Sequence, residues 1–288
     1  MRVFLAGATG AIGRRLVPML VEAGHAVTGM TRRPEGADLL RALGAEAVAA
    51  DARDRDGVEA AVRHAAPDVV MHQLTDLRAG SSASNAALRR DGTRNLVDAA
   101  RAANVGRVVA QSIAWVYAPG DDPATEDVPL DLNAPEPRLT TVKGVADLEA
   151  AVAEMPAWVV LRYGLLYGPG TWYAPGGMRA DEARAGRLTA GRDVSSFVHV
   201  DDAATAAVEA LEWPTGIVNV CDDEPASGRE WVPVFCAAVG APPPPKDDAP
   251  RRPWARGASN AKARGDLGWT PHHPSWRQGF HTDARSTT

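Results

Sequence analysis

Short, continuously hydrophobic runs alternate with longer amphipathic stretches along this chain. The short runs are RVFLAG (residues 2–7), HAVTGM (25–30), AEAVAA (45–50), DVVMHQL (68–74), RVVAQSI (107–113), WVVLRYG (158–164) and IVNVCD (217–222). Hydrophobicity without alternation is typical of strands that are buried on both faces of a sheet. The amphipathic stretches include GVEAAVRHAA (57–66), TRNLVDAARAA (93–103) and TVKGVADLEAAVA (141–153). This order predicts βαβ units and therefore an α/β fold, a doubly wound parallel sheet.

The residue composition of the sequence changes from Tyr167 onward. Proline, glycine and tryptophan gather in GPGTWYAPGG (168–177) and APPPPKDDAPRRPW (241–254), and a helix at 201–212 and the strand IVNVCD are predicted between them. We expect residues 1–166 to form the main α/β domain, with 196–224 returning to it. Residues 167–195 and 225–288 are expected to form a smaller, irregular lobe that binds a substrate.

Composition narrows the class of partner. The chain is 45% hydrophobic and 23% charged, so it can bury a full core. Its net charge of -5 and its lack of a long Lys/Arg cluster argue against nucleic acid or a membrane surface, so a small molecule is the expected ligand. Neither a signal peptide nor a membrane-spanning run is apparent, and Cys221 and Cys236 are interpreted as buried thiols, so we expect a cytoplasmic protein. We expect it to be a monomer or a homodimer.

Three glycines follow the first predicted strand directly and open a helix. Gly7 would make the tight turn, Gly10 would let the backbone approach a pyrophosphate, and Gly13 would let the helix pack close to the strand. The alternative is an ordinary tight turn between strand and helix. The pattern predicts that the main domain is a dinucleotide-binding Rossmann domain, in which the same loop contributes Thr9, Ala11 and Ile12.

The second strand ends in Thr31, Arg32 and Arg33. An acidic residue at this strand end would bind the adenosine ribose of NAD, whereas guanidinium groups suit a 2'-phosphate, so NADP(H) is predicted and NAD(H) is less favoured. Arg32 and Arg33 could instead be solvated surface charges. Asp51 is predicted to meet the adenine edge, with a helix N-cap as the alternative. The same cofactor is expected to contact Ala52, Gln73 and Leu74.

With these motifs in place, the chain resembles the extended short-chain dehydrogenases/reductases, which include NAD(P)-dependent epimerases and dehydratases. The resemblance runs through GATGAIG (7–13), VMHQLT (70–75), DGTRNLVDAA (91–100), LRYGLLYGPG (161–170), FVHVDD (197–202) and AKARGDLGW (261–269). It therefore covers nearly the whole chain. It implies a Rossmann fold, a nicotinamide cofactor and oxidoreductase activity.

The chemistry of that family depends on a Tyr-x-x-x-Lys pair and on a serine or threonine. Lys143 matches the lysine, but Leu139 stands at the tyrosine position and Ile113 at the serine position. Ser112 is one residue away and, by strand alternation, would face the other side of the sheet. Lys143 could bind the nicotinamide ribose or could be an exposed lysine. Tyr117 is our first candidate for a replacement proton donor, so the predicted catalytic groups are Tyr117, Ser112 and Lys143.

The missing tyrosine resembles atypical reductases that act on aromatic polyketides such as angucyclinones. We therefore predict an NADPH-dependent ketoreductase of secondary metabolism whose aromatic ketone carries its own phenolic proton donor. Trp115, Trp172 and Tyr173 are candidate contacts for that substrate. The alternatives are a sugar-nucleotide epimerase or dehydratase, which Leu139 disfavours, and a non-catalytic NADP-binding regulator.

The stretch FVHVDD offers His199, Asp201 and Asp202, a combination that could suggest a metal site. No third ligand is apparent at a useful spacing, so we interpret the aspartates as the cap of a helix and predict no metal. His272 and His273 lie in a proline-flanked loop and are interpreted as surface residues.

Overall fold

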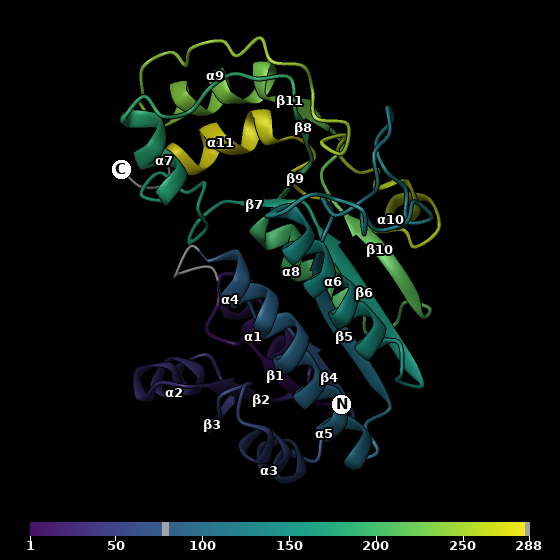
Figure 1. Cartoon of the computed structure of the whole chain (residues 1–288). Coiled ribbons are helices and arrows are strands. Elements are labelled where there is room, and N and C mark those ends of the chain that lie inside the picture. Colours follow the sequence, from purple (N-terminus) through teal and green to yellow (C-terminus); the bar gives the residue numbers. More distant parts are fainter. Residues whose placement is uncertain (77–80, 286–288) are drawn as a thin grey trace. The chain divides into compact units, whose positions relative to one another are not determined.

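The computed structural model of the chain describes residues 1–76 and 81–285 (Figure 1). Its central feature is a seven-stranded sheet in the order β10-β6-β5-β4-β1-β2-β3. These strands are β1 (Arg2–Ala6), β2 (Ala26–Thr31), β3 (Glu46–Ala49), β4 (Val69–His72), β5 (Arg107–Ile113), β6 (Ala157–Tyr163) and β10 (Gly216–Val220). β1 pairs in parallel with β2 and β4, β2 with β3, and β4 with β5. The predicted doubly wound parallel sheet is confirmed, with each of the seven hydrophobic runs forming one strand.

The chain divides into two compact units. Unit 1 comprises residues 1–112, 130–161 and 204–217, and unit 2 comprises 113–129, 162–203 and 218–288. This division describes backbone compactness, whereas the domain boundaries predicted from the sequence concern which part binds which ligand. Those boundaries stay a prediction.

Unit 1 places helices over the sheet. They are α1 (Gly13–Glu22), α2 (Pro34–Ala42), α3 (Arg55–Ala65), α4 (Ser82–Ala87), the π-helical turn η1 (Leu88–Gly92), α5 (Thr93–Ala102) and α6 (Arg138–Val152). Figure 1 shows α3, α5 and α6 side by side, and their apolar faces share one core cluster with β1, β4 and β5. Asp54 is the N-cap of α3, and its carboxylate accepts a hydrogen bond from the Gly57 amide at 3.2 Å.

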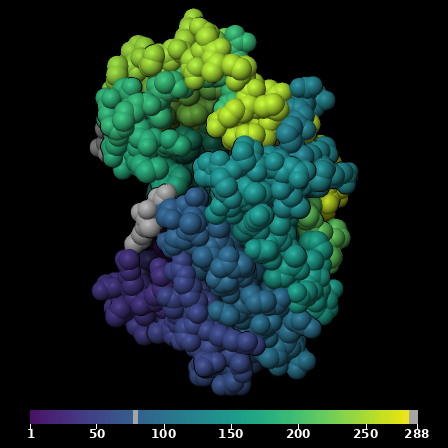
Figure 2. Space-filling model, viewed as in Figure 1, coloured from purple at the N-terminus to yellow at the C-terminus, as the bar shows by residue number. Residues whose placement is uncertain are grey.

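Unit 2 carries short strands and a separate aromatic core. β7 (Leu165–Tyr167) pairs in parallel with β9 (Phe197–His199), and β8 (Val194–Ser195) pairs antiparallel with β11 (Ala226–Ser227). The helices are α7 (Met178–Arg184), α9 (Gly228–Ala238), α10 (Ala261–Gly265) and α11 (Trp276–Arg285). α9 packs against α7 and α11, and Figure 2 shows the green segment around α7 beside the yellow-green segment around α9. Their core is aromatic and includes Tyr167, Tyr173, Phe197, Phe235, Trp276 and Phe280.

The structure corrects one expectation about this part of the chain. The lobe expected to be irregular, 167–195 and 225–288, contains the helices α7, α9 and α11. The proline- and glycine-rich segments 168–177 and 241–254 themselves contain no helix, as predicted. A capping box between Ser227 and Glu230 starts α9. The predicted helix at 201–212 is confirmed as α8 (Val200–Glu209), and both cysteines are buried thiols as predicted. Among the helices described, none has the length and apolar character needed to cross a bilayer.

Candidate functional site

Two of the three glycines after β1 are required by close backbone contacts. Gly7 has φ of +89°, and a Cβ atom there would lie 2.3 Å from the Gln73 carbonyl oxygen. A Cβ atom at Gly13 would lie 2.3 Å from the Gly7 carbonyl oxygen. Gly10 differs, because it is exposed and a Cβ atom there would approach only the Gly7 oxygen, at 3.2 Å. Glycine at 10 therefore leaves the outer side of the loop open for a ligand, as a pyrophosphate requires.

The end of β4 supplies a buried amide that fits a bound group. Neither side-chain polar atom of Gln73 has a hydrogen-bond partner within residues 1–76 and 81–285, although both atoms are buried. Buried amides are almost always hydrogen-bonded, so the Gln73 side chain fits a polar ligand placed against it. The Leu74 carbonyl accepts a hydrogen bond from Gln111 at 2.9 Å, which fixes the backbone beside it. The loop and this amide together fit a dinucleotide.

The end of β2 carries the predicted arginines. Arg32 and Arg33 are exposed, and the Arg32 guanidinium lies 3.6 Å from the Asp51 carboxylate. Thr31 is buried, and its hydroxyl accepts a hydrogen bond from the Arg33 amide at 3.3 Å. The alternative interpretation of Asp51 as a helix cap is wrong, because Asp54 caps α3. Ala52 is buried, and its carbonyl accepts a hydrogen bond from Asn95 at 2.8 Å.

Of the predicted catalytic groups in unit 1, Lys143 lies on α6 and Ser112 contacts that helix. Lys143 is exposed and Leu139, one helical turn earlier, is half-buried. The Ser112 hydroxyl donates to the Glu149 carboxylate at 2.8 Å in the interior. Because its single proton is directed at α6, the geometry gives Ser112 a structural contact and no support for its predicted catalytic role. Lys143 keeps an accessible ammonium group without a phenol in the usual place beside it.

The sequence analysis missed a buried arginine whose charge acts on His72 of β4. Arg89 lies in the π-helical turn η1 with 5% of its surface exposed, and burial lowers its pKa to about 10. Burial and the neighbouring Arg89 charge lower the pKa of His72 to about 4, so the imidazole is neutral. Its Nδ1 accepts from the Leu74 amide at 3.2 Å, so Nε2 carries the proton that it shares with Thr93 at 2.9 Å. This network holds the backbone next to Gln73.

Unit 2 contains a cavity of about 230 Å³. Aromatic and cationic side chains share its wall, namely Trp115, Tyr117, Arg179, Arg252 and Trp254. The Tyr117 hydroxyl donates to Asn219 at 2.5 Å, and the Arg162 guanidinium lies 4.8 Å from the centre of the Tyr117 ring. Burial raises the pKa of Tyr117 well above its ordinary value, so this phenol stays protonated.

The three residues predicted to contact the substrate lie in different parts of unit 2. Trp115 lines the cavity and is 38% exposed. Tyr173 is buried in the aromatic core, with ring centres 5.4 Å from those of Phe197 and Phe235, and neither it nor Trp172 is among the cavity-lining residues. Packing rather than ligand contact accounts for Tyr173.

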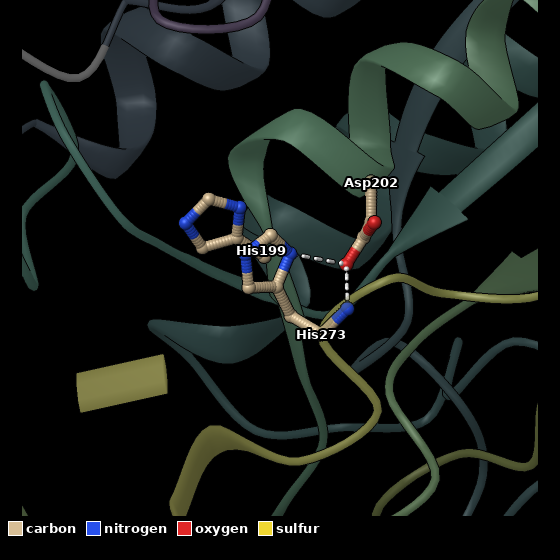
Figure 3. Close-up of side chains that lie close together, drawn as sticks. All are labelled: His199, Asp202 and His273. Atoms are coloured by element: carbon tan, nitrogen blue, oxygen red, sulfur yellow. Dashed lines mark hydrogen bonds and ion pairs between the residues drawn. The ribbon is translucent and has the colours of Figure 1, made fainter. Parts of the chain in front are cut away.

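A second polar cluster in unit 2 joins α8 to the loop before α11 (Figure 3). Asp202 is fully buried, and its carboxylate accepts hydrogen bonds from the backbone amides of His272 and His273, each at 2.9 Å. The His273 ring adds a contact at 3.1 Å and stacks on the His199 ring, with 3.7 Å between centres. His273, expected on the surface, is half-buried, and the Asp202 carboxylate holds a loop.

The same three side chains bring potential metal-binding atoms within 4.8 Å of one another. Both Asp202 oxygens are engaged by loop amides, and His199 Nδ1 accepts from the Asp201 amide at 3.2 Å. Stacked rings and engaged ligand atoms are unlike an open tetrahedral site. The arrangement therefore fits a structural clamp.

Comparison with known proteins places this geometry among its relatives. Residues 3–221 match the NAD dependent epimerase/dehydratase family. A 3-diazoavenalumate denitrifying reductase from Streptomyces sp. is 48% identical, across 97% of this chain and 99% of the relative. A UDP-glucose 4-epimerase from Mycolicibacterium smegmatis is 31% identical, across 94% of each chain.

Solved structures give the same answer for the fold. The UDP-glucose 4-epimerase of Thermus thermophilus in complex with NAD superposes with a TM-score of 0.78 at 27% identity. The match covers 99% of this chain and 98% of that one.

Proposed function

The chain belongs to the NAD dependent epimerase/dehydratase family and is an oxidoreductase, and from this premise we propose that it is an NADPH-dependent reductase of an aromatic small molecule. The observation that carries the proposal is Leu139 one turn before Lys143 on α6. Leucine cannot exchange a proton, so the reaction must need none from this position. Lys143 retains the accessible ammonium group that binds ribose hydroxyls in the family.

Several groups of unit 1 would hold the cofactor. The open side of Gly10 would receive the pyrophosphate, the Gln73 amide would meet a polar group, and Arg32 would pair with a 2'-phosphate. The bound dinucleotide supplies the hydride. Arg32 is what favours NADPH over NADH, because its guanidinium can form charge-assisted hydrogen bonds to a phosphate.

The acceptor must tolerate hydride without an acid at the usual tyrosine position. An aryl diazonium group does so, because hydride adds to its terminal nitrogen, the resulting aryl diazene loses N₂, and the ring keeps the hydrogen with no net proton required. The Streptomyces relative, a 3-diazoavenalumate denitrifying reductase, supports this acceptor. The aromatic ketone predicted from the sequence meets the same requirement when a neighbouring phenol supplies the proton.

Epimerase chemistry fits the site less well. Such a reaction oxidises an alcohol first and needs a base at the tyrosine position, which Leu139 cannot provide. The 31% identical epimerase therefore supports the fold and cofactor of this chain more than its reaction.

Absorbance of NADPH tests the proposal. Purified protein should consume NADPH with an aryl diazonium acid or with an ortho-hydroxyaryl ketone, and NADH should be used less well. Arg32→Ser should weaken the binding of NADPH about tenfold and leave the binding of NADH unchanged, because the 2'-phosphate is the only part of the cofactor that Arg32 is proposed to contact. Arg41→Ser, at an exposed position of α2, should change neither affinity. Turnover of UDP-glucose without NADPH loss, or binding without turnover of any acceptor, would contradict the proposal.

A further inference from the structure

The cavity of unit 2 combines flat aromatic walls with arginine. Trp115, Trp254 and Tyr117 supply three aromatic side chains to its wall. The Arg252 guanidinium lies 4.5 Å from the centre of the Trp254 ring. Such a wall accommodates a planar ligand better than a saturated sugar.

The two arginines of the cavity differ in their remaining hydrogen-bonding capacity. Arg252 is bound through its amide and guanidinium to the Asp193 carboxylate, at 2.8 and 2.6 Å. The Arg179 guanidinium donates through Nη1 to Glu182 at 2.6 Å and also interacts with the Tyr173 hydroxyl, but its Nε, which is buried, has no partner in the described part of the chain. A buried donor without an acceptor is costly, which favours a ligand that brings an acceptor to Arg179.

We infer that this cavity binds an aromatic monocarboxylate and that Arg179 anchors the carboxylate. The inference deepens the proposed function, on which it rests for the identification of the cavity with the substrate. Arginine is suited to this role because its planar guanidinium pairs with carboxylate oxygens through charge-assisted hydrogen bonds.

The charges around the cavity wall favour an aromatic monocarboxylate over a nucleoside diphosphate as the ligand. Arg179 and Arg252 each pair with one carboxylate, Glu182 and Asp193 respectively, so the charges around the wall are balanced. A single carboxylate adds one negative charge to this balanced set. A diphosphate would bring at least two negative charges, and Asp193 would repel them unless it gave up Arg252.

Isothermal titration calorimetry on the full chain with NADP⁺ present tests the inference. The probes are trans-cinnamate, its neutral isostere cinnamamide, and UDP. Wild-type protein should bind cinnamate about tenfold more tightly than cinnamamide, because only the acid pairs with Arg179. UDP should bind more weakly than cinnamate.

Arg179→Gln should remove the preference for the acid and leave cinnamamide affinity unchanged, whereas Arg187→Gln, an exposed arginine beyond the same helix, should preserve the preference. The wild-type ratio needs no variant, so it tests the inference even if Arg179→Gln fails to fold. Equal affinity of wild type for acid and amide, no binding of either, or tighter binding of UDP would overturn it. If these titrations fail while NADPH turnover is intact, only this inference is contradicted. If the acid binds selectively but no acceptor is turned over, only the proposed reductase activity is contradicted.

Discussion

The glycines in the loop after β1 differ in whether a side-chain methyl group would fit. Gly13 has no room for one, whereas Gly10 has more room and is proposed to face the cofactor. Gly13→Ala would place Cβ 2.3 Å from the Gly7 oxygen and 2.6 Å from Ala8 backbone atoms, so the backbone must shift. We expect it to lower the free energy of unfolding by about 2 kcal/mol, as overpacking in a core does. Gly10→Ala should change stability by less than about 1 kcal/mol and yet weaken NADP⁺ binding, because its methyl group would stand where the pyrophosphate approaches.

Urea unfolding and NADP⁺ titration on both variants separate these effects. Unaltered NADP⁺ affinity in Gly10→Ala would show that the loop is an ordinary turn.

The roles of Gly7 and Gly13 could be proposed from the sequence because a turn between strand and helix is local. Arg89 could not be singled out in LRRDG, because a π-helical turn changes which of two adjacent arginines points inward, and Arg90 is exposed.

At the scale of elements, the Asp202 clamp joins α8 to the loop before α11. Asp202→Ala would leave the amides of His272 and His273 without their acceptor, and we expect the free energy of unfolding to fall by about 2 to 4 kcal/mol. Asp201→Ala should cost less than about 1 kcal/mol, because that carboxylate is 46% exposed and lies 3.6 Å from His199. Urea unfolding of the two variants measures the difference. A rise in unfolding temperature of the wild type on adding Zn²⁺ would argue for a metal site instead of a clamp.

The clamp also marks the limit of prediction at this scale. The strand FVH and helix α8 were readable from local hydrophobicity, but the partner of Asp202 lies 71 residues further along the chain. A spacing rule for metal ligands or caps cannot reach across such a separation. The same limit applies to Trp115 and Arg179, which only the folded chain brings into one cavity.

At the scale of the whole molecule, the parallel sheet could be predicted. Each of its strands is a continuous hydrophobic run, and the helices between them show apolar residues at helical spacing. The helices of unit 2 could not be predicted, since proline and glycine around them suggest irregular chain. Long-range packing of Tyr173 with Phe197 and Phe235 stabilises that region, and such packing leaves no periodic trace in the sequence.

The pH dependence of stability follows from two buried groups of opposite sign. The His72 pKa falls from 6.5 to about 4 through burial, so between these values the unfolded chain binds one more proton and stability rises with pH. Burial raises the pKa of Asp222 from 3.8 to about 8, so over that range the folded protein holds the extra proton and stability falls as pH rises. The two contributions oppose each other from about pH 4 to 6.5, and Asp222 alone acts from there to about pH 8.

We therefore expect the free energy of unfolding to decline from about pH 6.5 to 8, by roughly 1 kcal/mol per pH unit from this group. Asp222→Asn should remove the decline, because an amide does not titrate, whereas Asp121→Asn at a 99% exposed side chain should leave it unchanged. Urea unfolding at about pH 5.5, 6.5, 7.5 and 8.5 measures the slope for each protein. An undiminished slope in Asp222→Asn would mean that Asp222 is ionised in the folded state, held by the Trp276 amide that donates to it at 2.9 Å.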